Sequence, residues 1–105
     1  MDTNLLKISE LTQIIAKNEN DIAARLERAE ILLGMNMIED AKQDIDFAIS
    51  ASPENGRAYK LRGAIKMNAG DKAEAAEDLR KAMELDPEIV KEIEGTFKQK
   101  LPSCH

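Results

Sequence analysis

Two pairs of carboxylates in this sequence are spaced by one helical turn, and paired acids are the first candidates for chemistry. Asp40 and Asp44 form one pair, and Glu74 and Asp78 form the other. A calcium loop needs alternating acids around a central glycine, with a glutamate at its end, and neither segment has that pattern. Lysines stand near both pairs at helical spacing. We therefore interpret these acids as solvated helix faces, with a carboxylate metal site as the alternative.

The candidates for nucleophilic or acid–base chemistry are confined to the last two positions. Cys104 is the only cysteine and His105 the only histidine, and both follow Pro102. A base must be oriented next to its nucleophile for such catalysis, and nothing in a terminal tail supplies that orientation. The five glycines are isolated, so no phosphate-binding loop is present. We expect no enzyme, no cofactor and no metal, with a metal or redox role of the Cys104–His105 pair as the alternative.

Composition limits the class of protein further. The 105 residues carry a net charge of −5, which argues against a sequence-independent nucleic-acid binder because phosphate neutralisation needs clustered Lys and Arg. A single cysteine excludes an internal disulfide, and the acidic start MDTNLLKISE lacks the basic and apolar regions of a signal peptide. No stretch approaches the roughly 18 apolar residues of a membrane span. We expect a soluble, cytoplasmic protein that binds neither nucleic acid nor membrane.

The elements that must position any site are helices. Apolar residues recur with the 3.6-residue period of an amphipathic helix, as at Leu5, Ile8, Leu11 and Ile15. Aromatic residues make up only 3% of the chain, so the core must consist of Ala, Leu, Ile and Met. Polar, Gly and Pro breaks divide the chain into six expected helices, and links of two to five residues make neighbours antiparallel. Asp71 and Glu74 have the spacing of a helix-capping box.

These breaks are periodic. Pro53 and Pro87 lie 34 residues apart, and the same shift matches Arg28 with Arg62 and Asp44 with Asp78. It also matches Ala41 with Ala75 and Ala48 with Ala82. A period of 34 residues in helix–turn–helix units is typical of one class of helical repeat.

On these residues the chain resembles the tetratricopeptide repeat family. The closest segment is GRAYKLRGAIKMNAGDKAEAAEDLRKAMELDP, residues 56–87. The unit at 22–55 is looser, with Arg25 where the family usually has an aromatic residue and Asn36 where it usually has glycine. The positions that carry the resemblance are small, aromatic or turn-forming residues: Ala29, Ala41, Ala48, Pro53, Tyr59, Gly63, Gly70, Ala75, Ala82 and Pro87.

The resemblance implies an all-α, right-handed superhelical stack of antiparallel helix hairpins within one domain, residues 1–105. We expect an N-terminal helix at 4–17, repeats at 22–55 and 56–87, a capping helix at 88–100 and a tail at 101–105. Neighbouring hairpins must stack because each buries its apolar face only against the next. We expect Ile89, Ile93 and Phe97 to face inward on the capping helix, and the acids of 72–86 to face solvent on the back of the stack.

Charge is distributed unevenly between the helices. The helix expected at 57–68 carries Arg57, Lys60, Arg62 and Lys66 and no acid. In the family the first helix of each repeat lines the concave groove, so the resemblance places one set of residues there: Leu26, Glu30, Leu33, Arg57, Lys60, Ala64 and Met67. Glu30 and Leu61 occupy positions where the family's chaperone-tail clamp has asparagines, so we do not expect chaperone tails to bind.

Two functions follow as hypotheses. The first is a non-enzymatic protein-interaction module, an adaptor or assembly factor, that binds a peptide or partner helix in this groove. Lys60 and Arg57 would pair with an acidic group or a C-terminal carboxylate. The alternative reading of these cations is that they complement acids on adjacent helices. The alternative function is self-association into a homo-oligomer through the N-terminal helix, which is apolar at Leu5, Leu6 and Ile8, or through the ends of the stack.

Overall fold

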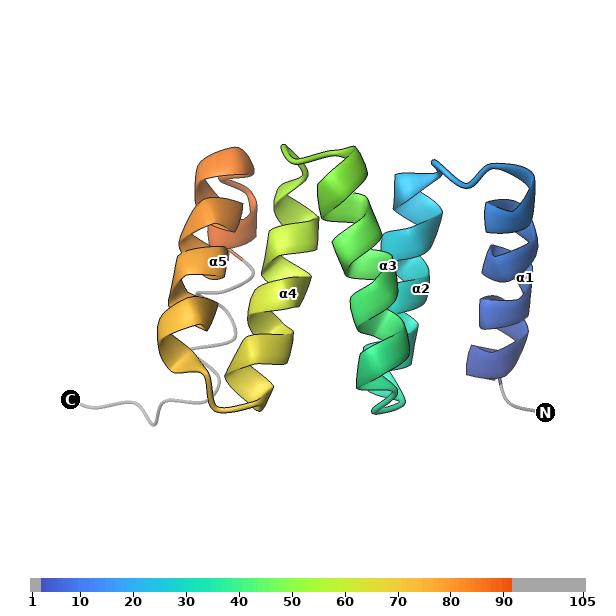
Figure 1. Cartoon of the computed structure of the whole chain (residues 1–105), viewed down its shortest axis with the longest axis horizontal. Helices are drawn as coiled ribbons and strands as arrows, with labels where there is room; N and C mark the ends of the chain where they lie inside the picture. Colours follow the sequence, from blue (N-terminus) through green and yellow to red (C-terminus); the bar gives the residue numbers. More distant parts are fainter. Residues whose placement is uncertain (1–2, 92–105) are drawn as a thin grey trace.

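Short polar breaks divide the chain into antiparallel helices that stand side by side in a row (Figure 1). The computed structural model describes residues 3–91. Its helices are α1 (Thr3–Lys17), α2 (Ile22–Gly34), α3 (Ile38–Ala51), α4 (Gly56–Asn68) and α5 (Lys72–Leu85), and a further helical turn begins at Ile89. The prediction of an all-helical stack is confirmed. The rest of the expected capping helix, with Ile93 and Phe97, and the tail with Cys104 and His105 lie outside the described residues.

The first helices of the two repeats begin with the same kind of cap. The Asp21 side chain accepts a hydrogen bond from the backbone N–H of Ala24 at 3.0 Å. Asn55, at the equivalent position of the second repeat, accepts one from the N–H of Ala58 at 3.3 Å. Each cap satisfies a backbone donor that the helix leaves unpaired in its first turn. Because Asp and Asn are equivalent in this role, the two repeats start alike although their sequences differ.

The second helices begin without such caps. Neither Met37 before α3 nor Asp71 before α5 makes a side-chain capping bond. The predicted capping box at Asp71 and Glu74 is therefore wrong. The pKa of Glu74 is raised instead, because its side chain lies close to the carboxylate of Asp71.

The turns between the two helices of each repeat share one backbone conformation. Gly70 has φ +87° and Asn36, its counterpart in the first repeat, has φ +62°. This left-handed region is free of strain for glycine and is tolerated by asparagine better than by most other residues. Asn36 in place of the family's glycine therefore leaves the path of the turn unchanged.

The core is continuous along the row and is built where small residues let the helices approach. Ala29, Ala41 and Ala48 in the first repeat and Ala75 and Ala82 in the second are fully buried. The larger side chains between them come mainly from Leu26, Leu32, Ile45 and Leu61. Close packing of this kind leaves no room for added side-chain volume, because protein interiors are as dense as organic crystals.

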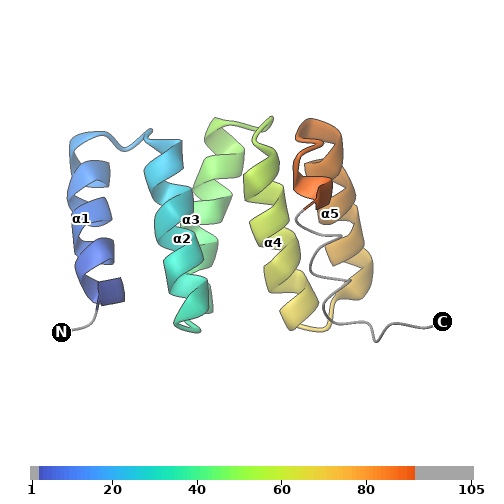
Figure 2. The same cartoon turned by 180° about the vertical axis from the view of Figure 1, so that it is seen from behind.

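Two glycines of α4 lie close to α5 and the residue after it. A Cβ on Gly63 would lie 3.1 Å from the Leu79 Cγ, and one on Gly56 would lie 2.9 Å from the carbonyl oxygen of Ala82. Tyr59 completes this end of the core with Ala82 and Ile89. Each helix contacts its sequence neighbour, and α2 also contacts α4. Figure 2 shows the face on which α2, α4 and the short segment after α5 lie in front.

Candidate partner-binding groove

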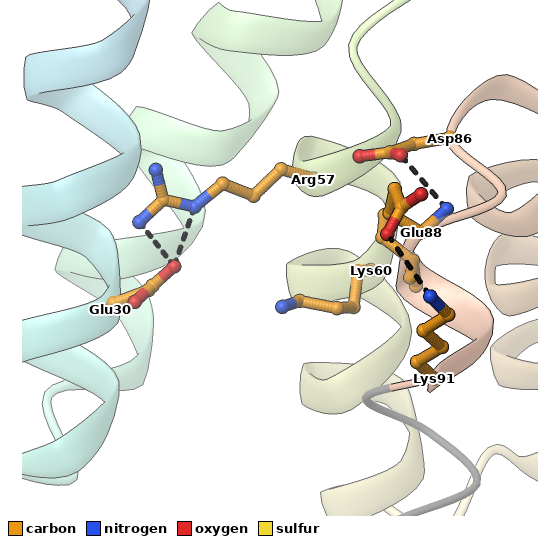
Figure 3. Close-up of a pocket in the computed structure, with 7 residues that line it drawn as sticks. Glu30, Arg57, Lys60, Asp86, Glu88 and Lys91 are labelled. Carbon is orange, nitrogen blue, oxygen red and sulfur yellow. Dashed lines mark hydrogen bonds and ion pairs between the residues drawn. The ribbon is translucent and has the colours of Figure 1, made fainter.

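A cleft of about 600 Å³ opens between α2, α4 and the chain that follows α5. Its walls carry both signs of charge (Figure 3), and the buried Ile89 also lines it. The lining residues are Glu30 from α2, Arg57 and Lys60 from α4, and Asp86, Glu88, Ile89 and Lys91 from the segment after α5. We call this cleft the groove. Its volume is in the range of ordinary ligand sites.

An ion pair between Glu30 and Arg57 crosses the groove. The Arg57 Nε donates to the Glu30 Oε1 at 2.6 Å, and the Arg57 Nη2 lies 2.5 Å from the same oxygen. The two side chains are 39% and 40% exposed, so water and salt reach the pair. Because Glu30 lies on α2 and Arg57 on α4, this contact joins the first helices of the two repeats.

The other charged residues that line the groove lie on α4 and on the wall formed by the segment after α5. Lys60 extends its amine from α4 into the space between α2 and α4 (Figure 3). On the wall after α5, the Asp86 Oδ1 accepts a hydrogen bond from the Glu88 backbone N–H at 3.1 Å, and the Lys91 Nζ lies 3.9 Å from a Glu88 carboxylate oxygen. Among the described residues that line the groove, three are acids and three are cations, so this part of it is mixed in charge rather than basic.

The structure places only some of the seven residues expected in the groove along its walls. Glu30, Arg57 and Lys60 line it together. Leu26 is 1% exposed and lies in the core, so its assignment to the partner-binding surface is wrong. Leu33 is half-buried against the same core. The other two residues, Ala64 and Met67, are exposed on α4 but are not among the side chains that line the cleft.

Sequence reasoning missed the wall formed by Asp86, Glu88, Ile89 and Lys91. These residues join the groove because the chain turns after Asp86 and returns alongside α4 (Figure 2). Ile89 is 3% exposed and packs beside Tyr59, which anchors the returning chain. The sequence did contain a signal for this wall, the apolar Ile89 two residues after Pro87. If this isoleucine packs inward against α4, the charged residues on either side of it must border the groove.

Comparison with known proteins identifies the repeat. The sequence model of the tetratricopeptide repeat matches residues 56–89. Residues 56–89 of the chain thus form a tetratricopeptide repeat. The chain is 34% identical to the ETO1-like protein 2 of Arabidopsis thaliana over 80 residues, an alignment that covers 76% of this chain and 8% of that protein. It is 36% identical over 61 residues to the DnaJ homolog subfamily C member 7 homolog of Dictyostelium discoideum, covering 58% of this chain and 11% of that one.

A solved structure shares the arrangement of helices in this chain. The crystal structure of MamA superposes with a TM-score of 0.74 at 26% sequence identity, over 86% of this chain and 53% of that chain. The chain thus spans about a tenth of the two curated relatives and about half of MamA. The tetratricopeptide repeat supports the coarse functional class predicted from the sequence, a protein–protein interaction module.

Two other cations of α4, Arg62 and Lys66, are paired outside the groove. Arg62 donates from Nε and Nη2 to the two carboxylate oxygens of Asp78, each at 2.9 Å. The Lys66 Nζ lies 3.0 Å from the Asp78 Oδ2. Together with the pairing of Arg57 to Glu30, these contacts match the alternative reading of the sequence, in which the basic residues of this helix complement acids on adjacent helices.

The first repeat contains the same ion pair at the equivalent positions. Arg28 donates from Nε to the Asp44 Oδ2 at 2.7 Å and from Nη2 to the Oδ1 at 2.6 Å. A second guanidinium, that of Arg25, donates to the Asp44 Oδ1 at 3.3 Å and stacks over the Phe47 ring, 3.6 Å from its centroid. The cation Arg25 thus occupies the aromatic position of the family and covers an aromatic ring on α3.

Both aspartates are buried. Asp44 is 2% exposed and Asp78 is 5% exposed, so the expectation that the acids of these helices face solvent is wrong for these two residues. Burial raises the pKa of Asp78, but the hydrogen bonds and charges of Arg62 and Lys66 outweigh it, and its pKa lies below the ordinary value. Within residues 3–91, no group of three or more acids, histidines or cysteines is placed to hold a metal ion.

Proposed function

We propose that the protein is a non-enzymatic interaction module that binds an acidic peptide or partner helix in the groove between α2 and α4. The observation that carries the proposal is the exposed Glu30–Arg57 pair across the cleft, with Lys60 beside it. A carboxylate of the partner, from a side chain or from a chain end, takes the place of Glu30 on Arg57 and approaches Lys60. A planar guanidinium suits this role because it donates two parallel bonds to a carboxylate.

The exchange is energetically feasible because the pair that it breaks is weak. Ion pairs between solvent-exposed side chains contribute only about 0–1 kcal/mol, and Glu30 and Arg57 are both more than a third exposed. Hydrogen bonds to charged groups that become shielded on binding contribute about 1.5–3 kcal/mol each. The released Glu30 carboxylate remains at the wall of the groove, where a basic side chain of the partner can pair with it.

The decisive experiment compares two charge reversals of equal size. Fluorescein-labelled peptides of aspartate, glutamate and leucine, with either a free or an amidated C-terminus, serve as probes in anisotropy titrations. The test variant is Arg57→Glu with Lys60→Glu. The control is Arg80→Glu with Lys81→Glu, two exposed cations on α5 outside the groove. We expect at least tenfold weaker binding for the test variant and little change for the control. Equal effects of the two double variants would contradict the proposal.

Glu30→Gln tests the exchange itself. Removing the internal competitor frees Arg57, so we expect acidic peptides to bind about two- to fivefold more tightly, in keeping with the small value of an exposed ion pair. A loss of affinity on this substitution would show that Glu30 orients Arg57 for binding rather than competing for it.

Self-association through α1 is the second candidate, and one observation favours it. Among the described residues, the exposed large hydrophobic side chains are concentrated on α1, where Leu5 is 56%, Leu6 51% and Ile14 44% exposed. Size-exclusion chromatography with light scattering tests it over a wide range of protein concentration. A monomer at every concentration would remove this candidate, whereas a dimer dissociated by Leu6→Asp would support it.

A further inference from the structure

A second cavity, of about 300 Å³, lies on the other side of α2. Ile8 and Thr12 of α1 border it, with Met37 and Asp40 at the start of α3. The buried Leu32 and Asp44 also line it, with the partly exposed Arg28 that pairs with Asp44. Arg28 and Glu30 are two positions apart on α2 and therefore point in opposite directions. This cavity, which we call the back pocket, is thus separate from the groove.

The apolar walls of the back pocket are not required by the repeat. A shift of 34 residues replaces Ile8 by Lys42, Leu32 by Lys66 and Met37 by Asp71. In the second repeat Lys66 reaches the buried aspartate at 3.0 Å. In the first repeat the apolar Leu32 stands in that place, and Arg25 supplies the second cation on the aspartate. The same fold is therefore stable with charged residues at positions where the first repeat keeps apolar ones.

The rim of the back pocket combines apolar and acidic groups. Met37 is 41% exposed, and methionine adapts its shape to different apolar partners. Leu5 is 56% exposed and stands one turn before Ile8 on α1, so it extends the apolar rim. The acids Glu39 and Asp40 are exposed in the first turn of α3. A bound segment that fills the pocket thus meets negative charge at its edge.

We infer that the back pocket is a second docking surface, for a basic amphipathic helix of a partner protein. An apolar side chain of that helix enters between Ile8, Leu32 and Met37, and a Lys or Arg one turn away pairs with Asp40. This partner is opposite in charge to the one proposed for the groove, and its binding does not depend on the groove.

The probe is a synthetic helical peptide of leucine, lysine and glutamine with one apolar face, about three turns long. Its binding is measured by fluorescence anisotropy and mapped by amide chemical-shift changes. The test variant Met37→Asp gives the first repeat the residue of the second. The matched control is Met67→Asp, which changes an equally exposed methionine on α4. Both substitutions are on the surface, and thermal melts check that the variants remain folded.

We expect Met37→Asp to weaken binding at least tenfold and Met67→Asp to change it less than twofold, with shifted amides around Ile8 and Met37. A peptide with glutamate in place of lysine should lose most of its affinity. Shifts centred on Arg57 and Lys60, equal effects of the two variants, or no binding at about 1 mM peptide would overturn the inference. So would a finding that Met37→Asp only dissociates a dimer, because the pocket would then be a contact between copies of this chain.

Discussion

Replacing Asp44 by alanine tests whether the buried ion pair of the first repeat is as central to folding as its geometry indicates. The carboxylate accepts three hydrogen bonds from the two guanidiniums of Arg25 and Arg28, at 3.3, 2.7 and 2.6 Å. Its side chain is 3% exposed, whereas those of Arg25 and Arg28 are 14% and 20% exposed. The substitution therefore leaves two largely covered cations without the acid that neutralises them.

The expected loss is limited by what the arginines keep. Removing one partner of a buried ion pair costs about 3–5 kcal/mol. Arg25 retains its bond to the Glu19 carbonyl at 2.8 Å and its stacking on Phe47. Arg28 retains its 3.2 Å bond to the Thr12 hydroxyl, and both guanidiniums reach some water. We therefore expect the lower end of the range, about 3 kcal/mol, which for a chain of this size lowers the Tm by roughly 12–24 °C.

Urea unfolding followed by circular dichroism measures this loss. The matched control is Asp46→Ala, which removes an exposed acid from the same helix and should change the free energy of unfolding by less than about 0.5 kcal/mol. The double variant Arg28→Met with Asp44→Leu should recover much of the loss, since a buried ion pair can often be replaced by apolar residues of similar volume. A loss below about 1 kcal/mol for Asp44→Ala would place the pair among weak surface contacts and refute the reasoning.

Three further predictions concern stability. Gly56→Ala should lower the free energy of unfolding by about 1–3 kcal/mol, because the new Cβ meets the Ala82 carbonyl oxygen at 2.9 Å. Gly34→Ala, where a Cβ has nothing within 4 Å, should raise the free energy of unfolding by about 0.4–1 kcal/mol. Urea melts that change in the same direction for both variants would contradict this. Ala75→Leu overpacks a fully buried position and should cost about 1–3 kcal/mol, and an unchanged Tm would rule out tight packing there. Because the pKa of Asp78 is lowered in the folded state, its contribution to stability is complete above the unfolded pKa of about 3.9 and is lost as the pH falls through the folded pKa. In urea titrations at a series of pH values, Asp78→Asn should therefore reduce the loss of unfolding free energy at acid pH.

The sequence predicted the stack because the stack depends on a few positions with strict size requirements. Ala41 and Ala48 recur as Ala75 and Ala82 in the second repeat, and each lies where two helices touch. Asn36 did not disturb the period because its backbone adopts the same left-handed turn as Gly70. Local size and backbone freedom are properties of single residues, so they can be read directly from the sequence.

The charges were predicted less well because their burial depends on tertiary partners. Asp44 and Asp78 have lysines close by in sequence, which is typical of solvated helix faces, yet both are covered by arginines of the preceding helix. The signal was present, since Arg28 and Arg62 repeat with the same shift along the sequence as the two aspartates. Leu26 shows the converse, because its place on the helix is compatible with either groove or core and only the neighbouring α3 and α4 decide it.

The Glu30–Arg57 contact has a mechanical consequence. Curvature in a repeat stack depends on how far apart the first helices of successive repeats stand, and here an exposed ion pair spans that separation. A contact of about 0–1 kcal/mol is comparable to thermal energy and is screened by salt. The ion pair therefore adds little resistance to a change in the separation of α2 and α4 beyond that of the core that the two hairpins share. We therefore expect the separation of α2 and α4 at the groove to change with ionic strength, which would let the groove admit partners of different width.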